Sequence, residues 1–141
     1  MKRLLLLFFS TCLTFSVAIA QCSSNEEEII ITINTDDYPT ETSWGLTDQN
    51  GLGWTNTPIS YSYANTTLIW TLCVPNTNCY TFTIEDANGN GICCAWGSGS
   101  YNVTYAGVTV ASGGSFGFSE VTNSIGNCAG PIGFAQTIGS L

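Results

Sequence analysis

Short segments that alternate large apolar residues with small polar ones recur along this chain. The clearest are 80–84 (YTFTI) and 101–105 (YNVTY). A period of two is typical of half-buried β-strands, and no segment carries a helical period. Further strands are expected at 29–33, 41–47, 67–73, 108–111 and 116–125, with an edge strand broken by Pro58 at 53–63 and an Asn50-Gly51 hairpin turn before it. The pattern predicts an all-β fold, a disulfide-stapled, jelly-roll-like antiparallel β-sandwich.

The first twenty residues have the features of a secretory signal peptide. A basic start (Lys2, Arg3) precedes an apolar run, and Ala18-Ile19-Ala20 supplies the small-x-small cleavage pattern. A membrane anchor is disfavoured because the apolar run is short. We therefore expect a signal peptide at 1–20 and one secreted β-sandwich domain at 21–141, of which 129–141 is an uncharged, fairly apolar tail.

Removal of that leader would leave a chain without basic side chains. Lys2 and Arg3 are the only two basic residues and histidine is absent, whereas ten Asp and Glu residues follow, so the side-chain charge becomes −10. Nucleic acid and anionic membranes are excluded as partners, because both require Lys or Arg. Catalysis is not expected, since there is no imidazole base, amine or guanidinium. Only a carboxylate pair for glycoside hydrolysis remains formally possible, and no two acids stand out for it.

Six cysteines remain in the predicted secreted chain, an even number that is typical of a disulfide framework. A zinc site is disfavoured because histidine is absent and no CxxC pair occurs. Cys73 and Cys79 flank one turn, so we expect them to bond to each other. Adjacent cysteines rarely bond to each other, so Cys93 and Cys94 are expected to bond Cys22 and Cys128.

The segment 86–91 (DANGNG) matches the first half of a calcium-binding loop. Oxygen ligands at alternate positions, here Asp86, Asn88 and Asn90, followed by glycine let a chain wrap one hard cation. The position of the bidentate Glu of an EF-hand holds Gly97, so a β-loop calcium site would take Glu85, Glu120 or backbone carbonyls instead. The alternative is a plain tight turn. A second possible cation site is formed by three acids that follow the first strand: Asp36, Asp37 and Glu41.

Four tryptophans are many for a chain of this length. Trp44 and Trp70 are in phase with core positions of their strands and are expected to pack inside. Trp54 and Trp96 lie in glycine-flanked segments, where an exposed indole can stack on a sugar ring or a protein partner. They are the candidate ligand-binding residues.

Two Asn-x-Thr sequons begin at Asn65 and Asn102. They are candidate glycosylation sites in a secretory pathway that carries the required machinery.

The segments TDDYPTETSWGLTDQNG, TLCVPNTNCYTFTIEDANGNGICCAWGSGSYNVT and ASGGSFG together resemble a β-rich accessory module of secreted bacterial and protist proteins. That module has the pattern TDxYPxETSW followed by CYxFxIxDxxGDGICCxxGxGxY, and the likeness covers most of residues 28 to 117. It implies an extracellular, adhesion-like role without a defined activity. Asn90 stands where the module often has Asp.

Composition and motifs together predict a secreted protein that binds or assembles rather than catalyses. The first hypothesis is an adhesion or carbohydrate-binding module, supported by calcium, which recognises an extracellular glycan or protein surface. The alternative is a structural subunit of an extracellular matrix or filament, which pairs with copies of itself through its sheet edges and its tail.

Overall fold

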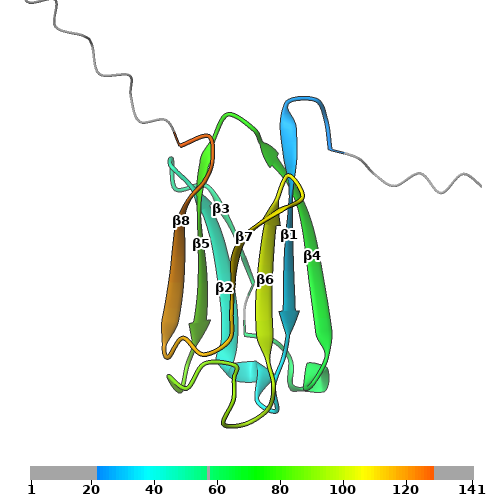
Figure 1. Cartoon of the computed structure of the whole chain (residues 1–141), viewed down its shortest axis with the longest axis vertical. Helices are drawn as coiled ribbons and strands as arrows, with labels where there is room; N and C mark the ends of the chain where they lie inside the picture. The colour runs from blue at the N-terminus through cyan, green and yellow to red at the C-terminus, as the bar shows by residue number, and fades with distance from the viewer. Residues whose placement is uncertain (1–21, 57, 129–141) are drawn as a thin grey trace, which may run out of the picture.

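The computed structural model describes residues 22–56 and 58–128, and its strands form two four-stranded sheets (Figure 1). The predicted signal peptide and the tail 129–141 lie outside the described residues. The first sheet has the order β4 (Thr67–Pro75), β1 (Glu26–Asn34), β6 (Ser100–Tyr105), β7 (Val108–Gly113). The second has the order β3 (Gly53–Asn56), β2 (Thr42–Asp48), β5 (Cys79–Asp86), β8 (Ser119–Gly126). All neighbouring strands are antiparallel, and the predicted all-β sandwich is confirmed.

Alternating side chains from both sheets form the core. In β1 the inward positions are Ile29, Ile31 and Ile33, and in β5 they begin with Tyr80 and Phe82. All five of these side chains are fully buried. The expected packing of Trp44 inside the protein is also confirmed: it is buried and meets the half-buried Trp70 of the opposite sheet, with ring centroids 5.3 Å apart. Period-two patterning therefore sets which face of each strand is buried.

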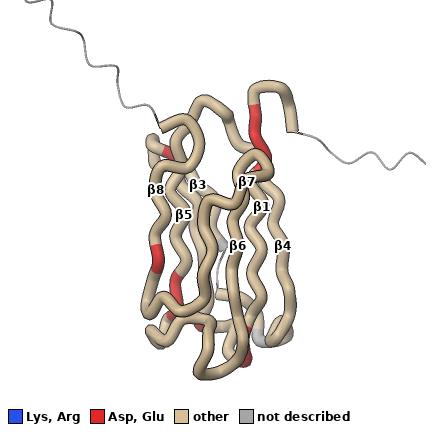
Figure 2. Tube along the Cα trace, viewed as in Figure 1, with Lys and Arg blue, Asp and Glu red and all other residues tan. Residues whose placement is uncertain are grey.

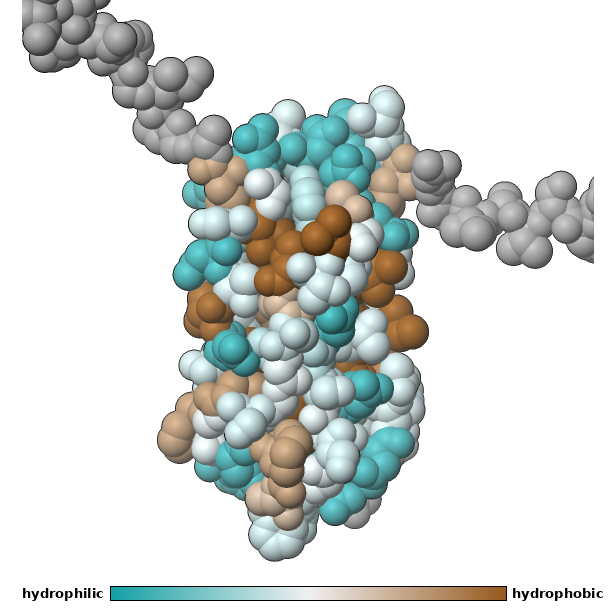
Figure 3. Space-filling model, viewed as in Figure 1, coloured by the Kyte–Doolittle hydropathy of each residue, from teal (hydrophilic) through white to brown (hydrophobic). Residues whose placement is uncertain are grey.

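The two ends of the sandwich differ. At the lower end in Figure 1, the chain crosses between the sheets four times, in the β1–β2, β3–β4, β5–β6 and β7–β8 connections. The upper end carries the tight turns, including the predicted Asn50-Gly51 hairpin, which joins β2 to β3 and has Gly51 at φ 80°. Val108, 66% exposed, lies at the tip of the β6–β7 hairpin, where Figure 3 shows apolar atoms at the surface. None of the described residues belongs to a helix long and apolar enough to span a membrane.

The predicted disulfide pairing is wrong, although all six cysteines are bonded. The bonds join Cys22 to Cys73, Cys79 to Cys128, and Cys93 to Cys94. Cys73 and Cys79 flank one turn, but β4 and β5 belong to different sheets, so each cysteine bonds within its own sheet. Cys22 precedes β1, the neighbour of β4, and Cys128 follows β8, the neighbour of β5.

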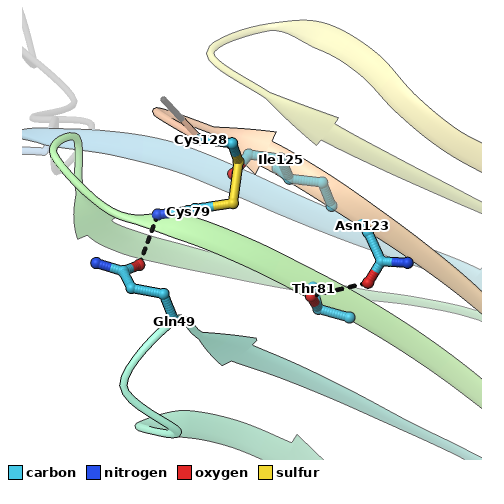
Figure 4. Close-up of a disulfide and its surroundings, with 6 residues drawn as sticks. All are labelled: Gln49, Cys79, Thr81, Asn123, Ile125 and Cys128. Atoms are coloured by element: carbon cyan, nitrogen blue, oxygen red, sulfur yellow. Dashed lines mark hydrogen bonds between the residues drawn. A yellow bond between two sulfur atoms is a disulfide. The ribbon is translucent and has the colours of Figure 1, made fainter. Parts of the chain in front are cut away.

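The neighbouring cysteines bond to each other because the chain ends are out of their reach. Cys93 and Cys94 lie in the β5–β6 connection at the lower end, whereas Cys22 and Cys128 lie at the upper end (Figure 1). Around the Cys79–Cys128 bond, the backbone N–H of Cys79 donates to Oε1 of Gln49 at 2.7 Å, and Thr81 donates to Asn123 at 3.1 Å (Figure 4).

Candidate functional site

Two of the crossing connections meet at the lower end and enclose a cavity of about 290 Å³. The β1–β2 connection includes the short 3-10 helix η1 (Pro39–Glu41), and the β5–β6 connection is the long loop 87–99. The cavity is lined by two aromatic rings, one carboxylate and two amides: Tyr38, Trp96, Glu41, Asn88 and Asn90. Figure 2 shows acidic positions at this end of the molecule and no basic position along the described trace.

The β5–β6 loop turns sharply because Asp86 holds its backbone. Asp86 ends β5 with its side chain only 3% exposed. Its Oδ1 accepts hydrogen bonds from the N–H groups of Gly89 (2.6 Å) and Asn90 (3.0 Å). Gly89 has a φ of 76°, which suits glycine. The tight turn that was the alternative to a calcium loop is therefore present in the backbone, and the buried carboxylate is hydrogen-bonded to Asn90, a residue of the cavity lining.

The β1–β2 connection presents a second buried carboxylate to the same place. Asp36 is only 4% exposed, and its Oδ1 accepts a hydrogen bond from the N–H of Tyr38 at 2.9 Å. The next η1 residues bring Glu41 to the cavity, where it accepts a hydrogen bond from the side-chain amide of Asn88. The backbone carbonyl of Glu41 also accepts the N–H of Ala87 at 2.9 Å, so the two connections are joined at this point.

A second contact between the two connections positions the rings of Tyr38 and Trp96. The N–H of Asp37 donates to the carbonyl of Trp96 at 2.9 Å. The rings of Tyr38 and Trp96 meet edge to face, with centroids 5.7 Å apart and planes at 89°. Gly97 lets the loop lie this close, because a Cβ there would come within 2.9 Å of the Cβ of Asp36. Trp96 nevertheless remains 53% exposed. The β5–β6 loop is therefore held by its backbone, while the ring of Trp96 stays accessible to solvent.

The acids beneath the cavity repel one another. Burial, and after it the nearby charge of Asp86, raises the pKa of Asp36 above its ordinary value. Desolvation also raises the pKa of Glu41, and the charges of Asp86 and Asp36 add to this. No basic side chain of residues 22–56 and 58–128 compensates these charges. The site therefore favours a cation from outside the chain.

The fit to a metal ion is mixed. Within the described ranges, no group of three His, Cys, Asp or Glu side chains is placed to hold a metal ion. One observation points the other way: Oδ1 of Asn90 is buried and has no hydrogen-bond partner. A buried amide oxygen beside carboxylates is a ligand of the type that calcium takes. Calcium would therefore need this amide in addition to the carboxylates of Asp36 and Asp86.

The structure brings together most of the predicted site residues. The calcium loop with Trp96 beside it and the second acidic group were predicted as two separate features, yet residues of both lie around one cavity. Asp37 lies at its margin, where its carboxylate accepts the side-chain amide of Asn65 at 2.8 Å. Asn65 is one of the two sequon residues.

The remaining predicted residues lie elsewhere. Glu85 is exposed on the face of β5 opposite to Asp86, beside Ser43, and Glu120 lies in β8 near Tyr101. Trp54 belongs to β3 and is half-buried against Tyr80, with ring centroids 6.4 Å apart. The second sequon residue, Asn102, lies in β6 with its amide 3.4 Å from Thr109 Oγ1.

Sequence reasoning did not identify Tyr38 as a site residue. A signal for it was present, since Tyr38 stands between Asp37 and Pro39 in the segment TDDYPTETSW, which carries part of the resemblance. The other half of that resemblance includes the β5–β6 loop, and these two segments are the ones that meet at the cavity.

Comparison of the chain with protein-family models, with curated proteins and with solved structures gives no match. Evidence for function therefore comes from the site alone.

Proposed function

We propose that this protein is a secreted, non-catalytic binding module of the adhesion or carbohydrate-binding type. Its ligand site is the cavity between Tyr38 and Trp96, and its partner is an extracellular glycan or protein surface. The observation that supports this most directly is the half-exposed indole of Trp96, anchored by backbone hydrogen bonding and placed beside amides and a carboxylate. Exposed aromatic rings on rigid loops with a polar border are typical of recognition sites.

Two further features support a binding role outside the cell. The three disulfides are typical of proteins from oxidising compartments. The described chain also lacks His, Lys and Arg, the side chains that most often act as general bases or bind anionic transition states.

Calcium is part of this proposal as a supporting ion. Asp36, Asp86 and the buried Oδ1 of Asn90 are the groups that would hold it. When bound, a hard dication neutralises the two buried carboxylates and fixes the loop that carries Trp96. Terbium luminescence sensitised by Trp96 tests this: the signal should appear on titration, fall when calcium competes, and be lost in Asp86→Asn. A silent titration would remove calcium from the proposal.

A glycan array tests the binding function itself. The secreted protein is applied with calcium and, in parallel, with EDTA. Trp96→Ala should lose the bound glycans, whereas Tyr63→Ala should keep them, because Tyr63 is an exposed aromatic residue that does not line this cavity. No binding under either condition, or equal binding by both variants, contradicts the carbohydrate reading.

A second candidate is self-assembly, and the edge strand β4 favours it. β4 is nine residues long, forms one border of the first sheet, and exposes 63% of Ile69. It carries no charged side chain, and charges are the usual protection of an edge against pairing with another chain. A hollow of about 390 Å³ lies beside it, lined in part by Ile69, Trp70 and Tyr63.

Light scattering at high protein concentration tests assembly. The full-length chain should form oligomers, which Ile69→Lys and truncation before Ile132 should both dissociate. Val108→Lys is the control, since it adds the same charge to the exposed β6–β7 hairpin. A full-length chain that stays monomeric rules this candidate out.

A further inference from the structure

We infer that the Tyr38–Trp96 cavity binds an organic ammonium group, of the quaternary kind that choline carries. This inference rests on the proposed function, because it specifies the ligand chemistry of the same site. It differs from the carbohydrate hypothesis because the group that enters the cavity is a cation.

The arrangement of the two rings favours a cationic ligand. Tyr38 and Trp96 stand at 89° to each other with centroids 5.7 Å apart, and they are 41% and 53% exposed. Both residues line the cavity, so their rings form two of its walls. The faces of aromatic rings are negative, and ammonium groups surrounded by such rings are held by cation–π attraction.

The negative charge of the site also favours a cationic ligand. Glu41 lines the cavity, and its pKa is raised by burial and then by the charges of Asp86 and Asp36, so all three carboxylates are close enough to act on one another. None of them has a basic side-chain partner among the described residues. The local potential therefore attracts a cation and rejects phosphate, sulfate or uronate ligands.

The hydrogen bonds within the site favour a ligand that has no N–H or O–H donors. Glu41 already accepts the side-chain amide of Asn88, and the free Oδ1 of Asn90 has no exposed surface. The cavity thus offers few free acceptors at its surface to a ligand with several N–H or O–H donors. A quaternary ammonium needs none, since it binds through its charge and its methyl groups. A volume of about 290 Å³ is at the lower limit for ligand pockets, which suits a small head group.

The inner acids and the rim acid can serve different cations. If calcium occupies the buried pair Asp36 and Asp86, Glu41 is still available at the rim to face an ammonium group. The ammonium group should therefore bind both with and without calcium, but more weakly with calcium, which neutralises the two buried carboxylates. The titration is accordingly made both with calcium and with EDTA.

The test compares choline with its neutral isostere 3,3-dimethylbutan-1-ol, in which carbon replaces the charged nitrogen. Each is titrated into the full secreted protein, and binding is followed by tryptophan fluorescence and calorimetry. Choline should bind about tenfold more tightly than the alcohol, and its affinity should fall as salt is raised. Equal affinity for the two compounds, or no choline binding with or without calcium, overturns the inference.

Matched variants locate the site. Trp96→Ala should weaken choline binding about tenfold, whereas Tyr63→Ala should leave it unchanged. Glu41→Gln should weaken it severalfold, and Glu85→Gln, which removes the same charge from the outer face of β5, should not. Equal effects of Glu41→Gln and Glu85→Gln would show only a general charge effect and would contradict the site. Circular dichroism of each variant confirms that it is folded.

The two proposals fail in distinguishable ways. If the array detects glycans that depend on Trp96 and choline does not bind, the binding module stands and the ammonium inference falls. If choline binds through Trp96 and the array stays empty, the carbohydrate reading falls and the cavity keeps its cationic ligand. If neither glycans nor choline bind, the carbohydrate hypothesis and the ammonium inference are both wrong.

Discussion

The rings of Tyr38 and Trp96 meet at 89° across two loops that come from opposite halves of the sequence, and the N–H of Asp37 donates to the carbonyl of Trp96 beside them. The backbone bond positions the indole, so its ring can stay exposed without the loop being loose. In this site the backbone of Trp96 holds the residue in place, and its side chain remains free to contact a ligand.

Replacement of Trp96 by alanine should therefore cost little stability. We expect a loss of about 1 kcal/mol or less, the scale of one edge-to-face aromatic pair, because the backbone hydrogen bond survives. Trp44→Ala is the reference, since Trp44 is buried against Trp70 and its removal should cost about 3–5 kcal/mol. Urea unfolding of both variants measures the difference, and a comparable loss in the two would show that Trp96 is structural.

The acids beneath the cavity give stability a defined pH dependence. The pKa of Asp36 and that of Glu41 are raised above their ordinary values of 3.8 and 4.5, first by burial and then by neighbouring carboxylates. In the window above those values, the folded protein binds more protons than the unfolded chain. Their stabilising contribution is therefore complete below the unfolded pKa values and is lost as the pH rises through the folded ones.

Asp36→Asn should consequently raise the free energy of unfolding at pH 7 without calcium, by about 1 kcal/mol, and flatten its decline with pH. Asp48→Asn is a control with the opposite sign. Partial desolvation acts to raise the pKa of Asp48, but the N–H groups of Asn50 and Leu52 outweigh it and hold that pKa low. Loss of that carboxylate should reduce stability at neutral pH. Urea titrations between pH 3 and 8 would contradict this account if Asp36→Asn were destabilising.

Strand positions and their buried faces follow closely from the sequence, because alternation of side chains reports the two faces of a strand directly. The strands predicted at 67–73 and 108–111 became β4 and β7, each extended by two residues at its C-terminal end. The sheet to which each strand belongs could not be predicted from the sequence. A turn such as 76–78 can join two strands of one sheet or cross to the other, and the local pattern does not distinguish these, so the disulfide pairing was wrong.

The site was predicted in pieces for the same reason. Asp36, Asp86 and Trp96 each have a local signal, an acid or an indole among turn residues. Their meeting depends on β1 and β5 both ending at the lower end, which is a property of topology. The role of Tyr38 depends on a ring angle, which no sequence pattern records.

The disulfide that joins Cys22 to Cys73 should stabilise the fold mainly by lowering the entropy of the unfolded chain. It spans 51 residues, for which the loss of chain entropy corresponds to about 4 kcal/mol. The double variant with serine at both positions should lose about that amount. The pair Cys93 and Cys94 closes no loop of comparable length, so its double serine variant should lose much less.

Peptide mapping under non-reducing conditions checks the pairing itself. Digestion with a Glu-specific protease and chymotrypsin suits this chain, because no Lys or Arg follows Arg3. Neither protease cleaves between Cys73 and Cys79, so the one peptide that holds both should be linked to the peptide of Cys22 and to that of Cys128, and Cys93 and Cys94 should appear in one peptide. A disulfide between Cys73 and Cys79 that leaves the Cys22 and Cys128 peptides unlinked to them would contradict the structure.

Gly99 closes the site loop onto β6, and its substitution tests whether that loop is packed. A Cβ at Gly99 would lie 2.1 Å from the carbonyl oxygen of Ile92 and 3.0 Å from that of Asn34, and backbone atoms cannot yield as a flexible side chain does. Gly99→Ala should therefore cost at least about 2 kcal/mol. It should also displace the loop that carries Trp96 and weaken the binding of every ligand to the cavity. Gly45→Ala is the matched control, since its Cβ would meet nothing closer than 3.8 Å, and its change should stay within about 1 kcal/mol. Equal stability of the two variants in urea would mean that Gly99 does not lie against Ile92 and that the loop is not packed in this way.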